Sequence, residues 1–290
     1  MTPNRNRVDR ATRLRPRARK RFGQHFLEPA WVDKLLGAIA PQPADLFVEI
    51  GPGRGALTRP LAARVRQLLA IEIDRNLAES LRARAPANLS VVTEDYLDAD
   101  LGALIANRLP PSDRPVRVAG NLPYNVGSPI LAKLLSDAGD GRVLSDATLL
   151  LQSEVADRLI ASPGSREYGV LSVFTQLRAD VRAVLALPAG AFRPVPKVRS
   201  TAVRLTFRPP AVTVDGRVFR LVVKTIFQRR RKTLLNATKP LADLAGLESA
   251  DALARAALDQ VRRPETLAIE ELARLAEVFV SAGLCAIVSP

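Results

Sequence analysis

The chain has 290 residues, of which 47% are hydrophobic and 25% are charged, and its formal net charge is +14. This composition excludes a disordered chain and supports one large domain or two modest ones, each with a packed core. The excess of positive charge favours an anionic partner, with nucleic acid as the leading candidate, because no basic amphipathic helix or lipidation motif indicates a membrane surface.

Residues 1–21 form a basic arm in which Asp9 is the only acid. Such a composition is typical of a solvated tail, and also of an arm that becomes ordered on a nucleic-acid backbone. The second interpretation makes Arg19, Lys20 and Arg21 candidate RNA contacts.

From about residue 45, short apolar runs typical of buried strands alternate with segments typical of helices. The predicted strands cover residues 46–50, 68–73, 89–92, 116–119 and 148–151. The predicted helices cover residues 57–65, about 75–85, and a segment that begins at Ser128 with Pro129 in its first turn. This order predicts a mainly parallel sheet with helices on both faces.

Two further strands, 181–187 and 201–207, are predicted to form a closing antiparallel pair, and Pro209–Pro210 then interrupts the chain. The remaining patterns predict helices at about 216–238, 249–260 and 266–282. We therefore predict an α/β fold: a Rossmann-like sheet domain over residues 22–208 and a small all-helical domain over residues 209–290.

A glycine-rich turn follows the first strand, where Gly51, Gly53 and Ala56 match the G-x-G-x-x-G/A pattern. Glu72 ends the second strand, where an acid can accept hydrogen bonds from both ribose hydroxyls. Asp95 ends the third strand, where it could meet the exocyclic amine of an adenine. Because the carboxyl ends of parallel strands meet at one edge of a sheet, these residues predict a site for an adenosine-containing cofactor.

NAD and S-adenosylmethionine both present an adenosine to such a site. Glu49, just before the glycine turn, suits the cationic methionine part of S-adenosylmethionine better than a pyrophosphate. The element Asn121–Tyr124, at the end of the fourth strand, has no evident task in hydride transfer. Both features favour S-adenosylmethionine.

The sequence Asn121, Leu122, Pro123, Tyr124 suits an adenine amine, which is a poor nucleophile because its lone pair is delocalised into the ring. The Asn121 side chain and the Leu122 or Pro123 carbonyl can accept both N–H bonds, and Pro123 stiffens the turn. Tyr124 can stack on a flipped-out base. Methyl transfer would follow from orientation, without a metal; the only histidine, His25, cannot build a zinc site or a triad alone.

Several ordered motifs carry a resemblance that extends almost from end to end. They lie at residues 20–27, 48–53, 71–74, 95, 120–124, 152–159, 168–172, 192–198, 227–234 and 263–265. Over these motifs the chain resembles the KsgA/Dim-type rRNA adenine N6,N6-dimethyltransferases. The resemblance implies a class I S-adenosylmethionine-dependent methyltransferase sheet.

The resemblance also implies roles for individual residues. S-adenosylmethionine contacts are implied for His25, Leu27, Gly51, Glu72, Asp95 and Asn121. Phe192 is implied to join Tyr124 in sandwiching the target base. The family commonly has Asn where this chain has His25; since an imidazole can also donate or accept a hydrogen bond, we expect binding to be retained with an altered contact.

By this resemblance the substrate is a pair of adjacent adenosines in a hairpin loop near the 3′ end of 16S rRNA, in the small ribosomal subunit. Each would be methylated twice, late in subunit assembly. Loop bases are cheap to unstack, which suits such an enzyme. The candidate phosphate contacts are the basic arm, Lys197, and the run Arg229, Arg230, Arg231 and Lys232, although that run could also be a solvated helix face.

Other functions fit parts of this pattern. An Erm-type enzyme, which methylates a 23S rRNA adenine and confers macrolide resistance, shares the fold and chemistry, but segments 192–198 and 227–234 are more similar to KsgA. A DNA adenine methyltransferase is disfavoured, because such enzymes typically carry Asp or Asn followed by Pro-Pro-Tyr, whereas this chain has Asn-Leu-Pro-Tyr at residues 121–124. A non-catalytic assembly factor is disfavoured by the intact Glu72, Asp95 and Asn121–Tyr124.

The single cysteine, Cys285, excludes a disulfide within the chain, and there is no long apolar segment or secretory signal. We therefore expect a cytoplasmic protein. Nothing in the sequence indicates an obligate dimer, and we expect a monomer.

Overall fold

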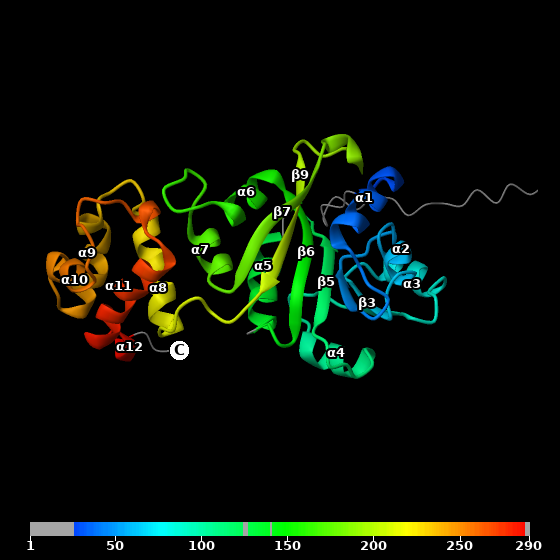
Figure 1. Cartoon of the computed structure of the whole chain (residues 1–290), viewed down its shortest axis with the longest axis horizontal. Helices are drawn as coiled ribbons and strands as arrows, with labels where there is room; N and C mark the ends of the chain where they lie inside the picture. The colour runs from blue at the N-terminus through cyan, green and yellow to red at the C-terminus, as the bar shows by residue number, and fades with distance from the viewer. Residues whose placement is uncertain (1–25, 124–126, 140, 288–290) are drawn as a thin grey trace, which may run out of the picture.

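The computed structural model describes residues 26–123, 127–139 and 141–287 (Figure 1). The basic arm, with Arg19, Lys20 and Arg21, and the predicted site residues His25 and Tyr124 lie outside the described residues. The strands are β1 (Phe26–Leu27), β2 (Leu46–Ile50), β3 (Gln67–Glu72), β4 (Leu89–Thr93), β5 (Val116–Asn121), β6 (Leu144–Gln152), β7 (Ala179–Leu187), β8 (Phe192–Arg193) and β9 (Ser200–Phe207).

Helices alternate with these strands and then take over the C-terminal part of the chain. The α-helices are α1 (Pro29–Ile39), α2 (Thr58–Ala62), α3 (Arg75–Arg82), α4 (Leu101–Arg108), α5 (Gly127–Asp137), α6 (Ser153–Ile160), α7 (Val170–Gln176), α8 (Gly216–Gln228), α9 (Leu234–Ala245), α10 (Ser249–Arg255), α11 (Ile269–Ser281) and α12 (Leu284–Ile287). Short 3-10 helices cover Ala189–Ala191 and Pro264–Thr266. Within the described part of the chain, no helix is both long enough and apolar enough to cross a membrane.

The main sheet of the described chain has seven strands in the order β4-β3-β2-β5-β6-β9-β7. Strands β4, β3, β2, β5 and β6 are parallel to one another, and β9 pairs antiparallel with both β6 and β7. This arrangement confirms the predicted mainly parallel sheet and its closing antiparallel pair. The order places the carboxyl ends of β4, β3, β2 and β5 side by side.

Both faces of the sheet are covered, because strand residues alternate between the faces. Phe47 and Leu68 pack in a cluster with apolar residues of α1 and α2. Val48 and Leu69, one position further along, pack in a second cluster with residues of α4 and α5. Strands buried on both sides read as continuous apolar runs, which is why they were recognisable from sequence.

A partly buried ion-pair network lies at the edge of the sheet opposite the carboxyl ends of the parallel strands. The Arg117 guanidinium donates to Asp45 Oδ2 at 2.7 Å and to both carboxylate oxygens of Asp146, at 2.6 and 2.9 Å. It also donates to the Ile39 carbonyl, at the end of α1, at 2.8 Å. These residues stabilise the scaffold at the edge away from the strands' carboxyl ends.

The C-terminal helices α8–α12 lie at one end of the molecule, beyond β7 (Figure 1). Their shared core contains Phe219, Val222 and Leu272, and also Tyr168 and Val173, which precede residue 209. The Tyr168 hydroxyl is buried and donates to the Leu267 carbonyl at 3.1 Å. The helical core is therefore completed by the α6–α7 segment of the chain.

The prediction of one helix over residues 216–238 is wrong. Helix α8 ends at Gln228 and α9 begins at Leu234, with a turn between them. The Leu234 N–H donates to the Arg262 carbonyl at 2.7 Å, and the Leu235 N–H donates to the Gln260 carbonyl at 3.1 Å. These bonds to a distant segment replace the bonds that a continuous helix would make.

Several elements were not predicted from the sequence: α1, α4, α6, α7 and the small β1–β8 sheet. Local signals for some of them exist, since Pro29 occupies the first turn of α1 and the Asp100 side chain accepts from the Ala103 N–H at the start of α4. Strands β1 and β8 have no such signal, because each has only two residues and they pair across 165 positions of the chain.

Candidate methyltransferase site

The residues predicted to bind a cofactor lie at the ends of adjacent strands. The glycine turn follows β2, Glu72 ends β3, Asp95 follows β4, and Asn121 ends β5. In open α/β sheets, ligands bind outside the carboxyl ends of the strands, where the strand order reverses. The order β3-β2-β5 makes β2 that reversal point, so the structure brings these residues to the expected edge.

The glycine turn has a backbone shape that favours glycine. Gly51 and Gly53 have φ values of 69° and 59°. The Gly51 N–H donates to the Ile71 carbonyl of β3 at 3.0 Å, which ties the turn to the sheet. A Cβ atom on Gly53 would lie 3.2 Å from the ring of Phe26 in β1. The turn is therefore held tightly between β3 and β1.

Glu72 is the best-positioned acid of the site. Its Oε2 accepts from the Gly53 N–H at 2.8 Å, and its Oε1 accepts from the Asp74 N–H at 2.9 Å. The residue is 4% exposed, and burial raises the pKa of its carboxyl, while these backbone donors oppose that rise. The carboxylate is thus fixed between the glycine turn and the start of α3, with lone pairs left for a ligand's hydroxyl groups.

Glu49 is a buried acid beneath this turn, with 2% of its surface exposed. Among the described residues, its Oε2 has no hydrogen-bond partner within normal hydrogen-bond geometry. Burial raises the pKa of Glu49 to about 8, with an opposing hydrogen bond from the Thr58 side chain and a smaller rise from the nearby Glu72 charge. A buried polar atom without a partner is rare in native proteins, and a polar or cationic ligand group would satisfy it.

Asp95 and Asn121 flank the acid and the turn, and both are half-buried. Asp95 Oδ1 accepts from the Leu97 N–H at 2.9 Å. The backbone after Asn121 is held to β6, because the Leu122 N–H donates to the Leu150 carbonyl at 3.2 Å. A Cβ on Gly51 would be 3.9 Å from the Asn121 carbonyl oxygen, so the glycine turn and the Asn121–Pro123 element are neighbours.

Leu27 and Phe192 face each other in the β1–β8 pair, and both are buried. Phe192 is 0% exposed and packs in the cluster with Leu27 and Leu187. Because the Phe192 ring is fully buried, it has no exposed face on which a base could stack, and its packing holds β1 against the sheet domain. The predicted sandwich of a base between Phe192 and Tyr124 stays a prediction, since Tyr124 lies outside the described residues.

The candidate phosphate contacts are not equivalent. Lys197, Arg229, Arg231 and Lys232 are exposed. Arg230 is held within the protein: it donates to the Ser165 carbonyl at 3.1 Å and lies 3.7 Å from Glu265 Oε2. The other basic residues of the run follow α8, far along the molecule from the glycine turn (Figure 1).

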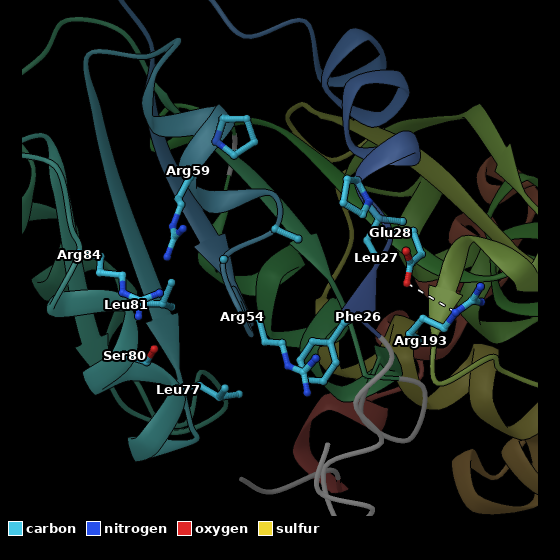
Figure 2. A pocket seen from close by; sticks show the side chains of 14 residues that line it. Phe26, Leu27, Glu28, Arg54, Arg59, Leu77, Ser80, Leu81, Arg84 and Arg193 are labelled. Atoms are coloured by element: carbon cyan, nitrogen blue, oxygen red, sulfur yellow. Dashed lines mark ion pairs between the residues drawn. The ribbon is translucent and has the colours of Figure 1, made fainter. Parts of the chain in front are cut away.

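The structure also shows a cationic hollow that sequence reasoning missed. Its volume is about 630 Å³, and its lining includes Arg54, Arg59, Arg84 and Arg193 (Figure 2). These arginines come from four separate segments, so no local pattern could have identified them. Arg54, inside the glycine turn, and Arg193, within the 192–198 motif, were the two that lay at recognised motifs. Across the residues that the structure describes, there is no cluster of three or more His, Cys, Asp or Glu side chains that could hold a metal ion.

Comparisons with known proteins agree with this geometry. The family "Ribosomal RNA adenine dimethylase" matches residues 15–279. The chain is 42% identical over 271 residues to a protein of Nitrosococcus oceani named ribosomal RNA small subunit methyltransferase A, covering 92% of this chain and 97% of that one. It is 43% identical over 269 residues to a protein of the same name from Xanthomonas oryzae pv. oryzae, covering 90% and 96%.

Two solved structures are similar over most of the chain. The 23S rRNA methyltransferase ErmE superposes with a TM-score of 0.64 at 26% identity, covering 88% of this chain and 99% of that one. A dimethyladenosine transferase from Plasmodium falciparum superposes with a TM-score of 0.73 at 24% identity, covering 89% and 98%, which supports the fold. The family match over most of the chain and the relatives above 40% identity lead to one conclusion: this chain belongs to the ribosomal RNA adenine dimethylase family.

Proposed function

We propose that this protein transfers methyl groups from S-adenosylmethionine to N6 of two adjacent adenosines in a hairpin loop near the 3′ end of 16S rRNA. The products are N6,N6-dimethyladenosines, and the role is in late biogenesis of the small ribosomal subunit. The observation that carries the proposal is the convergence of the glycine turn, Glu72, Asp95 and Asn121 on one sheet edge, in a chain whose relatives are named small subunit methyltransferases.

The described residues fit S-adenosylmethionine. We assign the ribose hydroxyls to Glu72, the adenine amine to Asp95, and the close backbone approach to Gly51 and Gly53. Glu49 Oε2, which has no hydrogen-bond partner among the described residues, fits the cationic methionine part. When bound, S-adenosylmethionine supplies an electrophilic methyl group on a sulfonium. Leu27 would close the site from β1, and His25 remains a proposed contact.

The target adenine is assigned to Asn121–Tyr124. The Asn121 side-chain oxygen and the Leu122 or Pro123 carbonyl accept the two N6–H bonds, which aims the nitrogen lone pair at the methyl donor. The bond from Leu122 to β6 keeps these acceptors in place. We keep base stacking for Tyr124, and for Phe192 we propose a positioning role: it fixes Leu27 through the β1–β8 pair.

RNA backbone contacts are proposed for the arm (Arg19, Lys20 and Arg21), for Lys197, and for Arg229, Arg231 and Lys232. Arg230 is omitted because its partners lie within the protein. We propose that residues 209–290 act as the rRNA-binding helical domain, with a core that the α6–α7 segment completes. We further propose that the protein acts as a cytoplasmic monomer.

The test uses tritiated S-adenosylmethionine with unmethylated small subunits, unmethylated large-subunit RNA and duplex DNA in parallel, for wild-type protein and Asn121→Ala. We expect about four methyl groups per small subunit from the wild type and none above background from the variant, since the loop bases are the accessible targets. Label on large-subunit RNA would instead assign the chain to the Erm-type activity, a possibility raised by the similarity to ErmE. No label on any substrate, together with tight binding to the subunit, would indicate a non-catalytic assembly factor.

A further inference from the structure

The hollow beside the glycine turn is lined by four arginines that the proposed chemistry does not use. We call Arg54, Arg59, Arg84 and Arg193, with the surface between them, the arginine groove. Arg54 is inside the glycine turn, Arg59 is in α2, Arg84 follows α3, and Arg193 is in β8. Figure 2 shows the Arg59 side chain directed from α2 toward α3, where Ser80 and Arg84 lie.

The charge of the groove is almost entirely positive. Glu28 is the one carboxylate among the described residues that line it; it lies 3.7 Å from Arg193, and both side chains of that pair are exposed to solvent. Among the residues that the structure describes, neither Arg59 nor Arg84 has an ion-pair or hydrogen-bond partner for its guanidinium, and both are exposed. In contrast, Arg82, only two residues from Arg84, donates to the Val91 carbonyl at 3.0 Å. Arg59 and Arg84 are therefore available to an outside anion.

The groove adjoins the candidate methyltransferase site. Arg54 lies over the Phe26 ring, with its guanidinium carbon 4.1 Å from the ring centre, and that ring is the one that crowds Gly53. The β1–β8 register places Arg193 opposite Phe26. The glycine turn therefore has the cofactor-binding edge of the sheet on one side and the arginine groove on the other.

We propose that the arginine groove binds the phosphate backbone of the substrate RNA where the strand passes the glycine turn. This inference rests on the proposed function. Guanidinium groups bind phosphate oxygens with paired, charge-assisted hydrogen bonds, and arginine is the preferred residue for this task. The exposed basic residues after α8 lie at the other end of the molecule (Figure 1). RNA would therefore be bound on both sides of the candidate methyltransferase site.

The test compares full-length wild-type protein with Arg59→Glu/Arg84→Glu and with a matched control, Arg108→Glu/Arg114→Glu. The control makes the same change in charge at exposed arginines at the end of α4 and just before β5. Each protein is titrated with unmethylated small ribosomal subunits at several salt concentrations, and S-adenosylmethionine binding and Tm are measured in parallel.

We expect the groove variant to bind the subunits about tenfold more weakly or worse, with a salt dependence shallower by about 1.4 in log–log slope, roughly 0.7 for each lost phosphate contact. Its S-adenosylmethionine binding and Tm should equal those of the control, and Arg59→Lys/Arg84→Lys should retain most of the affinity. Subunit affinity equal to that of the control would overturn the proposal, as would an equal loss in the lysine variant with a lowered Tm.

The two proposals can fail separately. If the wild type methylates the small subunit and the groove variant binds it like the control, only the arginine groove is wrong. If the wild type methylates no RNA but the groove variant still loses affinity for the subunit, the groove stands and the proposed methyl transfer falls.

Discussion

At the level of single residues, we predict that cofactor binding depends most on the Glu72 side chain. Replacing it with Gln keeps the size but places an NH₂ group toward one of the two backbone donors, Gly53 or Asp74. We expect Glu72→Gln to weaken S-adenosylmethionine binding by about 2 kcal/mol, the range for losing a hydrogen bond to a charged group. Calorimetric titration measures this loss.

The control for that experiment is Glu79→Gln, which removes an equal charge from α3. Glu79 is exposed, and its ion pair among the described residues is with exposed Arg75 at 2.9 Å. If Glu79→Gln weakened binding as much as Glu72→Gln, net charge rather than the position of Glu72 would explain the effect.

Glu49 is predicted to make the free energy of unfolding depend on pH. Its carboxyl has an ordinary pKa of 4.5, and burial raises that pKa to about 8 in the folded protein. Between these values the folded state holds a proton that the unfolded state releases, so the free energy of unfolding should fall as pH rises from about 4.5 to 8. Glu49→Gln should remove this slope and be the more stable form at pH 8, by about 2 kcal/mol or more.

Urea unfolding of both proteins at intervals from pH 5 to 9 measures the slope. Only the difference between wild type and variant is informative, since other groups titrate equally in both. Parallel curves for the two proteins would show that Glu49 is ionised in the folded state at neutral pH.

At the level of elements, the glycine turn must keep both its backbone shape and its contact with β1. Gly53→Ala adds a Cβ at 3.2 Å from the Phe26 ring, at a φ of +59°. Gly139→Ala is a matched control, because Gly139 has the same φ of +59° and no atom within 4 Å of the added Cβ. Both variants should lose about 1 kcal/mol of stability to backbone strain.

Only Gly53→Ala should also weaken S-adenosylmethionine binding, because the displaced turn moves the Gly53 N–H that donates a hydrogen bond to Glu72. The measurement is the pair of binding constants alongside the two Tm values. Equal binding by both variants would show that the contact between the turn and Phe26 has no part in the site.

At the level of the whole molecule, Arg230 and its neighbour Arg231 are predicted to have different roles: Arg230 in packing the C-terminal helices, and Arg231 in binding the small subunit. Arg230 connects the C-terminal helices to the α6–α7 loop by donating to the Ser165 carbonyl, and it also lies 3.7 Å from Glu265 Oε2 in the 3-10 helix Pro264–Thr266. In the same junction the Gly164 N–H of the α6–α7 loop donates to the Glu265 carbonyl at 2.7 Å. Arg230→Ala should lower stability by about 1 kcal/mol, the usual value for one hydrogen bond.

Arg231→Ala should leave Tm unchanged and weaken binding to the small subunit, because its side chain is exposed. Thermal unfolding and subunit binding of the two variants provide the comparison. An unchanged Tm in Arg230→Ala would mean that the junction does not need this arginine.

The sequence by itself determined the family, the strands β2 to β6 and the residues at their ends. Those features are local: buried parallel strands are continuous apolar runs, a tight turn needs glycine, and parallel strands present their carboxyl ends at one edge. Glu72, Asp95 and Asn121 could therefore be placed at the same edge without any tertiary information, and the structure confirms their positions at strand ends.

Only the tertiary structure decided which side chains are free to act. Burial of Phe192 follows from the pairing of β1 with β8. The break between α8 and α9 follows from the hydrogen bonds that the Leu234 and Leu235 N–H groups donate to Arg262 and Gln260. The engagement of Arg230 and the arginine groove likewise depend on segments far apart in the chain. A local pattern gives the charge and polarity of a residue, whereas its partners and exposure are set by contacts that form only when distant segments pack together.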